Sequence, residues 1–393
     1  MSQRKLIYMD HSATTPVHAD VVAAMLPYWT EDYGNPSSQH YFGRQAQNGL
    51  ETARQTIARL LNAKAKEIIF TGCGSESDNL AVRGVMFAAR NAGRGNHFIT
   101  SCIEHPAILE TGRQLVEQFG FEMTVLPVDG LGRVQPAELK KAIRPDTALV
   151  SIMAANNEIG TIQPIEELGR LARDNGALFH TDAVQAAGYR RWNLAELPID
   201  LLSMAPHKFY GPKGVGILYV RDGVELLPAL TGGGQENGQR PGTVNVPFAV
   251  GAAAAFALAM RDLEANVVHC QAVRDRLIER VLTQVPAGCL LTGDPVERLP
   301  HHVSFAFEDL SGNDLIINLD MQGLAASSGS ACSTGNPKPS ATLEALGLDP
   351  RYTLGGLRLT VGLQNSLDDA ERAAEIVTGA VASLRQFRAA LAG

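Results

Sequence analysis

Residues 67–80, EIIFTGCGSESDNL, decide the fold. The run at 67–70 is typical of a short strand, the glycines after it permit a tight turn, and a helical pattern follows at 75–90. The same alternation fills the chain between about residues 50 and 220. We expect further strands at 96–100, 122–126, 148–153, 177–181, 199–204 and 216–220, and helices at 50–60 and 165–175. This rhythm predicts an α/β fold with a mostly parallel seven-stranded sheet, helices on both faces, and ligands bound beyond the carboxyl ends of the strands.

The glycine turn itself offers a place for an anion. Gly72 and Gly74 precede Ser75 and Asp78, whose spacing is that of a helix capping box with Asp in place of the usual Glu. Free N–H groups at such a helix start can hold a phosphate. An ordinary strand-to-helix turn explains these residues equally well, and the pattern is neither GxGxxG nor a Walker loop, so it indicates no nucleotide.

The chain changes character after about residue 262. A connector rich in Gly and Gln at 231–242 precedes an Ala-rich helix at 248–260. A helix ending near 284, a strand at 303–305, a Gly/Ser-rich loop at 327–336 and a C-terminal helix then follow. This second part predicts a smaller α+β domain, and a length of 393 residues agrees with two or three domains.

Composition excludes several classes of protein. With 34 Lys+Arg and 41 Asp+Glu the net charge is 34 − 41 = −7, and no basic stripe occurs, so we expect no nucleic-acid partner. The longest apolar run, 248–260, falls short of the ~20 residues that span a bilayer. Residues 1–10 are too short and polar for a signal segment. The expectation is a cytoplasmic protein with no membrane contact.

The five cysteines are widely spaced and form no CxxC pair; they stand at positions 73, 102, 270, 289 and 332. Neither a disulfide framework nor a cysteine-based zinc site is therefore expected, and we expect no metal.

Two residues that follow consecutive strands suggest a cofactor. Asp182 comes at the end of one expected strand, and Lys208 comes after the next. Each alone is more commonly a helix cap or a surface charge. Together with the phosphate cradle at Gly74 they suggest pyridoxal 5'-phosphate, which needs an amine for its aldehyde, an acid for its ring nitrogen and an anchor for its phosphate.

Two further residues are weaker candidates. Cys332 lies in the small, polar loop at 327–336, which would leave a thiol reachable, although an incidental surface cysteine fits too. Arg358 lies inside an apolar strand-like run and needs an anionic partner. That partner is either a substrate carboxylate or a local Asp or Glu.

Six motifs in order carry a family resemblance: YMDHSATTP at 8–16, SESDN at 75–79, NNEIG at 156–160, HTDAVQ at 180–185, HK-YGPKG at 207–214 and SSGSAC at 327–332. The chain resembles the pyridoxal-phosphate-dependent cysteine desulfurases, specifically group I, the housekeeping and nitrogen-fixation type. The resemblance covers nearly the whole chain. It implies a fold type I homodimer, with a large cofactor domain at 15–262 and a small domain formed by 1–14 and 263–393.

The resemblance also implies residue roles at the cofactor. Lys208 would hold it covalently, Asp182 would pair with its ring nitrogen, and His105 would stack on the ring and assist proton transfer. Further cofactor contacts are implied for Gly74, Ser75 and His207 at the phosphate, Gln185 at the ring hydroxyl, Asn157, and the partner subunit's Thr243.

The substrate roles follow in the same way. Asn157 and Arg358 would bind the carboxylate of L-cysteine, and Cys332 would take its sulfur as a persulfide, leaving alanine. A sulfur-acceptor protein, such as an iron–sulfur scaffold, is the implied partner. The chain ends at Gly393, where some relatives continue into a tail that docks the scaffold, so this partner is less firmly implied than the substrate.

Departures from the family pattern leave alternatives open. Ala205-Pro206 stands where relatives often carry Ser followed by Gly or Ala, which removes a hydroxyl donor to the phosphate. Cys73 replaces a commoner Gly, and we interpret it as a small packed residue near the phosphate. A lyase acting on selenocysteine or cysteine sulfinate, an ordinary aminotransferase, and a cofactor-bound scaffold that binds a sulfur acceptor remain alternatives.

Overall fold

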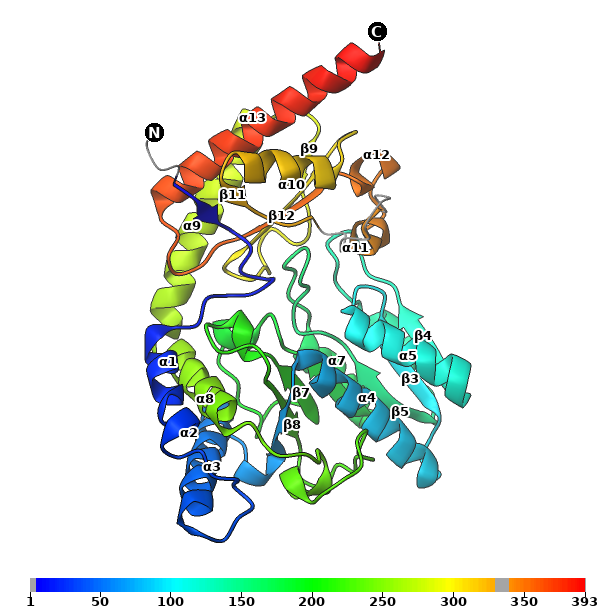
Figure 1. Ribbon diagram of the computed structural model, residues 1–393. Coiled ribbons are helices and arrows are strands. Elements are labelled where there is room, and N and C mark those ends of the chain that lie inside the picture. The colour runs from blue at the N-terminus through cyan, green and yellow to red at the C-terminus, as the bar shows by residue number, and fades with distance from the viewer. Residues whose placement is uncertain (1–4, 329–338, 393) are drawn as a thin grey trace.

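A seven-stranded sheet forms the centre of the larger part of the computed structural model, which describes residues 5–328 and 339–392 (Figure 1). Its order is β2-β8-β7-β6-β5-β3-β4. The strands are β2 (Ile68–Thr71), β3 (His97–Ser101), β4 (Glu122–Leu126), β5 (Thr147–Ser151), β6 (Leu178–Asp182), β7 (Leu201–Met204) and β8 (Gly216–Val220). Neighbours are parallel except around β8, which runs antiparallel to both β2 and β7. The predicted α/β class and mostly parallel sheet are confirmed.

Helices cover both faces of this sheet because its strands are apolar on both sides. Ile68 and Phe70 face a core shared with α1 (Ala19–Met25), α3 (Tyr41–Leu61), α6 (Pro136–Ala142), α7 (Ile165–Asp174) and α8 (Val246–Arg261). Ile69, between them, faces a second core shared with α4 (Gly74–Asn91) and α5 (Pro106–Phe119). Short turns of helix complete this part: α2 (Pro27–Thr30), η1 (Ala65–Glu67), η2 (Ala187–Tyr189), η3 (Pro206–Lys208) and η4 (Gln235–Gly238).

A separate core lies around a small antiparallel sheet of order β12-β10-β9. Its strands are β9 (Cys289–Leu291), β10 (His302–Phe307) and β12 (Gly356–Thr360). The helices around it are α9 (Leu263–Gln284), α10 (Gly312–Met321), α11 (Ala341–Ala345), α12 (Pro350–Thr353) and α13 (Leu367–Ala392). Near the N-terminus, β1 (Ile7–Tyr8) pairs in parallel with β11 (Leu324–Ala325), so Ile7 and Met9 belong to this core.

The two sheets lie at opposite ends of the molecule, and α9 and the N-terminal segment run between them (Figure 1). Among the described residues, no single helix has the length and apolar composition of a membrane span; α8 and α9 meet that test only when taken together, with a bend of 74°.

Candidate active site

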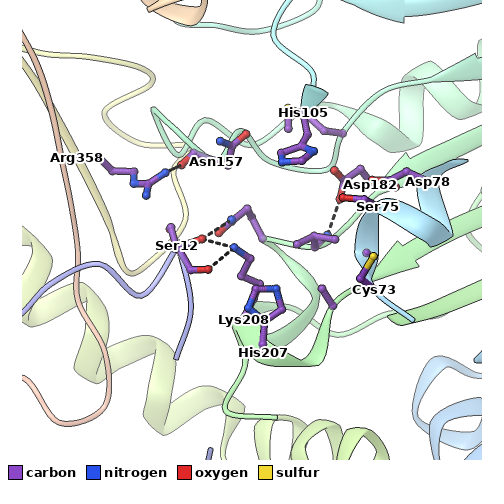
Figure 2. A pocket seen from close by; sticks show the side chains of 16 residues that line it. Ser12, Cys73, Ser75, Asp78, His105, Asn157, Asp182, His207, Lys208 and Arg358 are labelled. Atoms are coloured by element: carbon purple, nitrogen blue, oxygen red, sulfur yellow. Dashed lines mark hydrogen bonds between the residues drawn. The ribbon is translucent and has the colours of Figure 1, made fainter. Parts of the chain in front are cut away.

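A cavity of about 340 Å³ opens at the carboxyl ends of the parallel strands, where the two parts of the molecule meet. Figure 2 shows the side chains around it. Nine predicted site residues line this one cavity: Gly74, Ser75, His105, Asn157, Asp182, Gln185, His207, Lys208 and Arg358. They come from five separate strand-to-loop junctions and from the small sheet, so the fold brings together residues up to 284 positions apart (358 − 74).

Lys208 ends the turn η3 after β7 and extends into the cavity. Its Nζ donates to the main-chain oxygens of Ser12 and Ala13, at 2.5 and 2.8 Å. Burial and the nearby Arg358 guanidinium lower its pKa to about 8, against the opposing effect of Asp10 and Asp182. The amine is therefore far more available as a nucleophile or base near neutral pH than an exposed lysine.

Asp182 ends β6 on another wall of the cavity. Its Oδ1 accepts the Val184 N–H at 2.9 Å, which fixes the carboxyl group, and burial raises its pKa. Gln185 is buried beside it and donates through Nε2 to the Ser12 oxygen, while its Oε1 has no partner among the described residues. A buried amide oxygen without a donor is costly, so this part of the cavity is suited to a polar ligand.

The N-terminus of α4 lines the cavity at the place where the sequence predicts a phosphate cradle, but its cap differs from the prediction. The helix begins at Gly74, and Cys73 is the N-cap: its Sγ accepts the Glu76 N–H at 3.4 Å. The predicted capping box of Ser75 and Asp78 is therefore wrong, because the extended Cys73 starts the helix earlier and Asp78 then falls on its buried face. Our interpretation of Cys73 as packed is also wrong, since it is exposed and lines the cavity.

The cradle has room for a ligand because Gly74 lacks a side chain. A Cβ on this residue would lie 3.1 Å from Val184 and 3.2 Å from Ala205. His207 completes this end, with Nδ1 3.2 Å from Thr14 Oγ1. Burial and the charges of Lys208 and Lys213 lower the His207 pKa to about 4. This histidine is therefore neutral at physiological pH and acts as a hydrogen-bonding group.

His105 is the N-cap of α5, where its Nδ1 accepts the Ala107 N–H at 3.1 Å. An accepting Nδ1 carries no proton, so the neutral ring is protonated at Nε2. Burial lowers the pKa of His105, and of the two charges nearby Lys208 also lowers it while Asp182 raises it. The ring is held by the helix cap and can exchange a proton through Nε2.

Arg358 lies in β12 and reaches the cavity from the small sheet. Its Nη1 donates to the Asn157 oxygen at 3.0 Å, and its Nη2 donates to Asp10 Oδ1 at 2.8 Å. Of the two anionic partners that the sequence allows for Arg358, the structure shows one, the ion pair with Asp10. The buried Nε of the same arginine has no partner among the described residues. That donor is free for a carboxylate.

These residues lie in a fold shared with known proteins. The class-V aminotransferase family matches residues 7–373. The cysteine desulfurase IscS of Methanosarcina thermophila is 48% identical over 386 residues, covering 98% of this chain and 94% of that protein. The enzyme of the same name from Dictyoglomus turgidum is 43% identical, with 97% and 96% covered. This chain belongs to the class-V aminotransferases, among the cysteine desulfurases.

Solved structures agree with membership of this family. A NifS-like protein superposes with a TM-score of 0.89 at 36% identity, covering 96% of this chain and 100% of the other. The NifS-like protein of Rickettsia africae superposes with a TM-score of 0.85 at 28% identity, covering 96% and 99%. The fold is the fold type I arrangement of pyridoxal-phosphate enzymes, and pyridoxal phosphate is the cofactor of this class-V protein.

The cavity fits that cofactor. The helix start at Gly74 has the N–H groups that a phosphate needs, and Asp182 lies on a wall within reach of a ring nitrogen. The unpartnered Gln185 Oε1 needs a donor such as a ring hydroxyl. Ala205, where the sequence comparison expects a hydroxyl in relatives, lines the cavity without such a group.

Of the two remaining predicted site residues, the structure describes Thr243, which is exposed and does not line the cavity. Cys332 lies outside the described residues. Within 5–328 and 339–392, no group of three or more His, Cys, Asp or Glu side chains could hold a metal ion.

Sequence reasoning missed several contributors. The oxygens of Ser12 and Ala13 hold Lys208, and main-chain groups leave no signal in a sequence. Asp10 belongs to the YMDHSATTP motif, but the sequence analysis assigns it no role. The sequence analysis assigns Asp78 to a helix cap. Its place on the apolar face of the expected helix is a signal that the side chain is buried and could contribute to a site.

Proposed function

We propose that this protein converts L-cysteine to L-alanine and transfers the sulfur to Cys332 as a persulfide. The observation that carries the proposal is one cavity in which an activated amine, Lys208, and a buried acid, Asp182, lie close to a guanidinium, Arg358, with a free donor. This set provides for the amine, the ring nitrogen and the carboxylate of an amino-acid reaction. Kinship with cysteine desulfurases at up to 48% identity supports cysteine as the substrate.

Lys208, Asp182, Gln185 and the start of α4 would hold pyridoxal phosphate, with His105 against its ring and His207 near its phosphate. When bound, the cofactor supplies an electron-withdrawing ring, joined to the substrate amine, that stabilises negative charge at the α-carbon. Asp182 favours this chemistry because an ionised carboxylate beside the ring nitrogen keeps that nitrogen protonated.

Arg358 and Asn157 orient the substrate. The planar guanidinium lines the cavity with its Nε unpartnered among the described residues, while the Asn157 main-chain oxygen and Asp10 fix the other two nitrogens. When the carboxylate is fixed in this way, the amine and the thiol of cysteine face the opposite side of the cavity, and the groups there set their orientation.

Lys208 then moves the proton. With a pKa of about 8, the Lys208 amine is close enough to neutral pH that it would take the α-proton of the bound substrate and return it. His105 lies in the same cavity with Nε2 available, so it is the second group that can carry a proton to the product.

The sulfur step takes place at Cys332. Its thiolate attacks the sulfur of the substrate, the carbon–sulfur bond breaks, and the bonding pair stays with carbon, which is then protonated to give alanine. The cysteine retains the added sulfur as a persulfide, so no external oxidant or reductant is required. Supply of this sulfur to iron–sulfur clusters, by way of an acceptor protein, is the proposed outlet.

We also propose the domain division 15–262 against 1–14 and 263–393. The separation of the core around β12-β10-β9 from the two cores of the large sheet supports it, since Ile7 and Met9 pack with the later residues. Substrate would then bind between domains, with Arg358 from one and Lys208 from the other.

A homodimer is the proposed assembly. Thr243 is exposed on its own chain, where it could complete the phosphate site of a second copy. Large apolar side chains exposed along α1 to α3 support an interface there, since such patches are uncommon on monomers; they are Leu26, Trp29, Tyr33, Tyr41 and Phe42. We place the enzyme in the cytoplasm, where reducing conditions keep a thiol such as Cys332 able to accept sulfur.

The test is product analysis. The purified holoenzyme with L-cysteine should give alanine, and under a reductant it should give sulfide in equal amount. Cys332→Ala should lose both products, with Cys289→Ala, outside the cavity, as the matched control. Mercaptopyruvate, the keto acid that corresponds to cysteine, as the main product would indicate an aminotransferase, and full alanine production by Cys332→Ala would contradict the persulfide step.

A further inference from the structure

A second buried acid lies behind the residue assigned to the ring nitrogen. Asp78, on α4, and Asp182, on β6, line the same wall of the cavity (Figure 2). Both are at least 95% buried. The Asp78 Oδ1 has no hydrogen-bond partner among the described residues. Two like charges so placed would repel each other in a medium of low polarity, so one proton must stay with the pair.

His180 connects Asp78 to the sheet. Its side chain is fully buried in β6, two residues before Asp182. Its Nδ1 lies 2.8 Å from Ser151 Oγ and its Nε2 lies 3.0 Å from Ser203 Oγ. The Nε2 is also 3.8 Å from Asp78 Oδ1. Ser203 therefore lies between the imidazole and the acid, and its hydroxyl also hydrogen-bonds Asp78.

The same number of protons can be placed in two ways. Either Asp78 is a neutral acid beside a neutral His180, or an aspartate faces an imidazolium. Burial disfavours the charged pair, because two separated charges lose hydration that one contact of 3.8 Å does not replace. The hydroxyls on both ring nitrogens suit a neutral imidazole, with one donating to it and the other accepting from it.

The other ionisable groups around this wall also favour a neutral Asp78. Glu104 is buried nearby and accepts Ser101 Oγ–H at 2.5 Å and the Met153 N–H at 3.0 Å, and in its ionised form it would repel a charge on Asp78. Lys208, and His105 when it is protonated, stabilise a charge on Asp182. Burial raises the Asp78 pKa well above its usual range and lowers that of His180 to about 3.

We propose that Asp78 is a neutral carboxylic acid, linked through Ser203 to a neutral His180, so that the negative charge of this acid pair resides on Asp182. Asp78 is then a positioning residue for the cofactor site. It occupies the space behind Asp182 with a polar group that adds no charge. The protonated ring nitrogen of the cofactor would then face the full negative charge on Asp182, and no part of that charge would lie on Asp78. This role rests on the proposed function, but the charge states can be measured without any turnover.

Infrared and NMR spectra of the full-length protein, with and without pyridoxal phosphate, test the charge states directly. The difference spectrum of wild type minus Asp78→Asn should contain the C=O stretch of a protonated acid at pH 7. The ¹⁵N signals of His180, assigned with His180→Gln, should show one protonated and one bare nitrogen from pH 6 to 8. A carboxylate band for Asp78 or an imidazolium signal for His180 would overturn the proposal, even if the protein proved not to desulfurate cysteine.

Cofactor affinity tests the positioning role. Asp78→Asn keeps the shape of the neutral acid. Its Kd for pyridoxal phosphate should therefore stay within about threefold of the wild-type value. The pH profile of the bound cofactor's absorption should not shift. Asp78→Ala leaves the Ser203 hydroxyl with His180 as its one partner and an empty space behind Asp182, and should weaken binding about tenfold. Asp182→Asn, which removes the charge, should weaken binding more and change the spectrum. An Asp78→Asn protein that behaves like Asp182→Asn would overturn the proposal.

Discussion

The Arg358 guanidinium donates to the Asp10 carboxylate at 2.8 Å, across 348 residues of chain. The same arginine pairs through its backbone with Ser327, which lies shortly before Cys332 in the sequence. One strand residue thus joins the N-terminal segment, the side of the cavity proposed to bind the substrate carboxylate, and the described residues that precede Cys332. Substrate binding at Arg358, as proposed, would therefore act directly on the strand residue that pairs with Ser327.

Replacing Arg358 with Lys should raise KM for cysteine about 10- to 100-fold, with a much smaller change in kcat. A lysine keeps the charge but loses the planar fork, and a charge-assisted hydrogen bond contributes about 1.5–3 kcal/mol. Steady-state kinetics of alanine formation measure this. Arg351→Lys, at an exposed ion pair on α12, is the matched control and should be unchanged. An unaltered KM in Arg358→Lys would remove this residue from the substrate site.

Attachment of the cofactor to Lys208 should depend on pH with a midpoint near 8 instead of the 10.5 of an ordinary lysine. The measurement is the initial rate at which the cofactor-free protein becomes fixed to pyridoxal phosphate, trapped with borohydride. Arg358→Ala should move the midpoint upward, because the Arg358 charge helps to lower the Lys208 pKa. A midpoint above pH 10 in the wild type would show that the amine is not activated.

Much of this architecture was predictable because its signals are local. The strand at 122–126 and the strand at 216–220 were predicted to the residue, since both are bounded by glycine or by a sharp change of polarity. The position of Lys208 after a strand, and of Asp182 at the end of one, predicted their common cavity, because carboxyl ends of parallel strands meet at one edge.

Glu104 should make the protein less stable as pH rises. Burial raises its pKa to about 8, above the 4.5 of an ordinary glutamate, so between these pH values the folded state holds a proton that the unfolded state has lost. The free energy of unfolding should fall across this window by at most about 5 kcal/mol relative to Glu104→Gln, and level off above it. Urea denaturation at pH 5, 6.5 and 8 measures the difference. Parallel curves for the two proteins would contradict it, and Glu110→Gln, exposed on α5, is the control.

The pair Arg54 and Glu236 should stabilise the connector at 231–242, which directly precedes Thr243. Arg54 donates to both Glu236 oxygens, at 2.7 and 2.8 Å, and Glu236 also accepts the Phe70 N–H at 2.9 Å. Glu236→Ala would leave the buried guanidinium with the more exposed Glu51 as its remaining counter-ion, and we expect a loss of about 3 kcal/mol in urea denaturation. Glu264→Ala, which breaks an exposed pair with Arg191, should have no measurable effect. Equal effects of the two substitutions would show that burial is irrelevant here.

Thr243 should act across subunits. Lys208→Ala and Thr243→Ala proteins, each impaired alone, should regain activity when mixed and allowed to exchange. Random exchange makes half of the dimers hybrids with one whole site each, so about a quarter of wild-type activity is expected. Activity equal to the sum of the separate proteins would mean that each subunit completes its own site.

The rest of the site was beyond the sequence because it depends on contacts between distant segments. Nothing near position 10 indicates that Asp10 pairs with Arg358, and nothing near 180 indicates that His180 connects two serines on neighbouring strands. The helix cap at Cys73 was missed for a different reason: a thiol is an uncommon cap, so the commoner Ser75 was preferred.

Mass spectrometry of the holoenzyme after incubation with L-cysteine, without reductant, tests the central claim most directly. The peptide that contains Cys332 should gain the mass of one sulfur atom in step with alanine, and should lose it when a thiol reductant is added. Alanine formed with this peptide unchanged, or the added sulfur on Cys73 alone, would contradict the account.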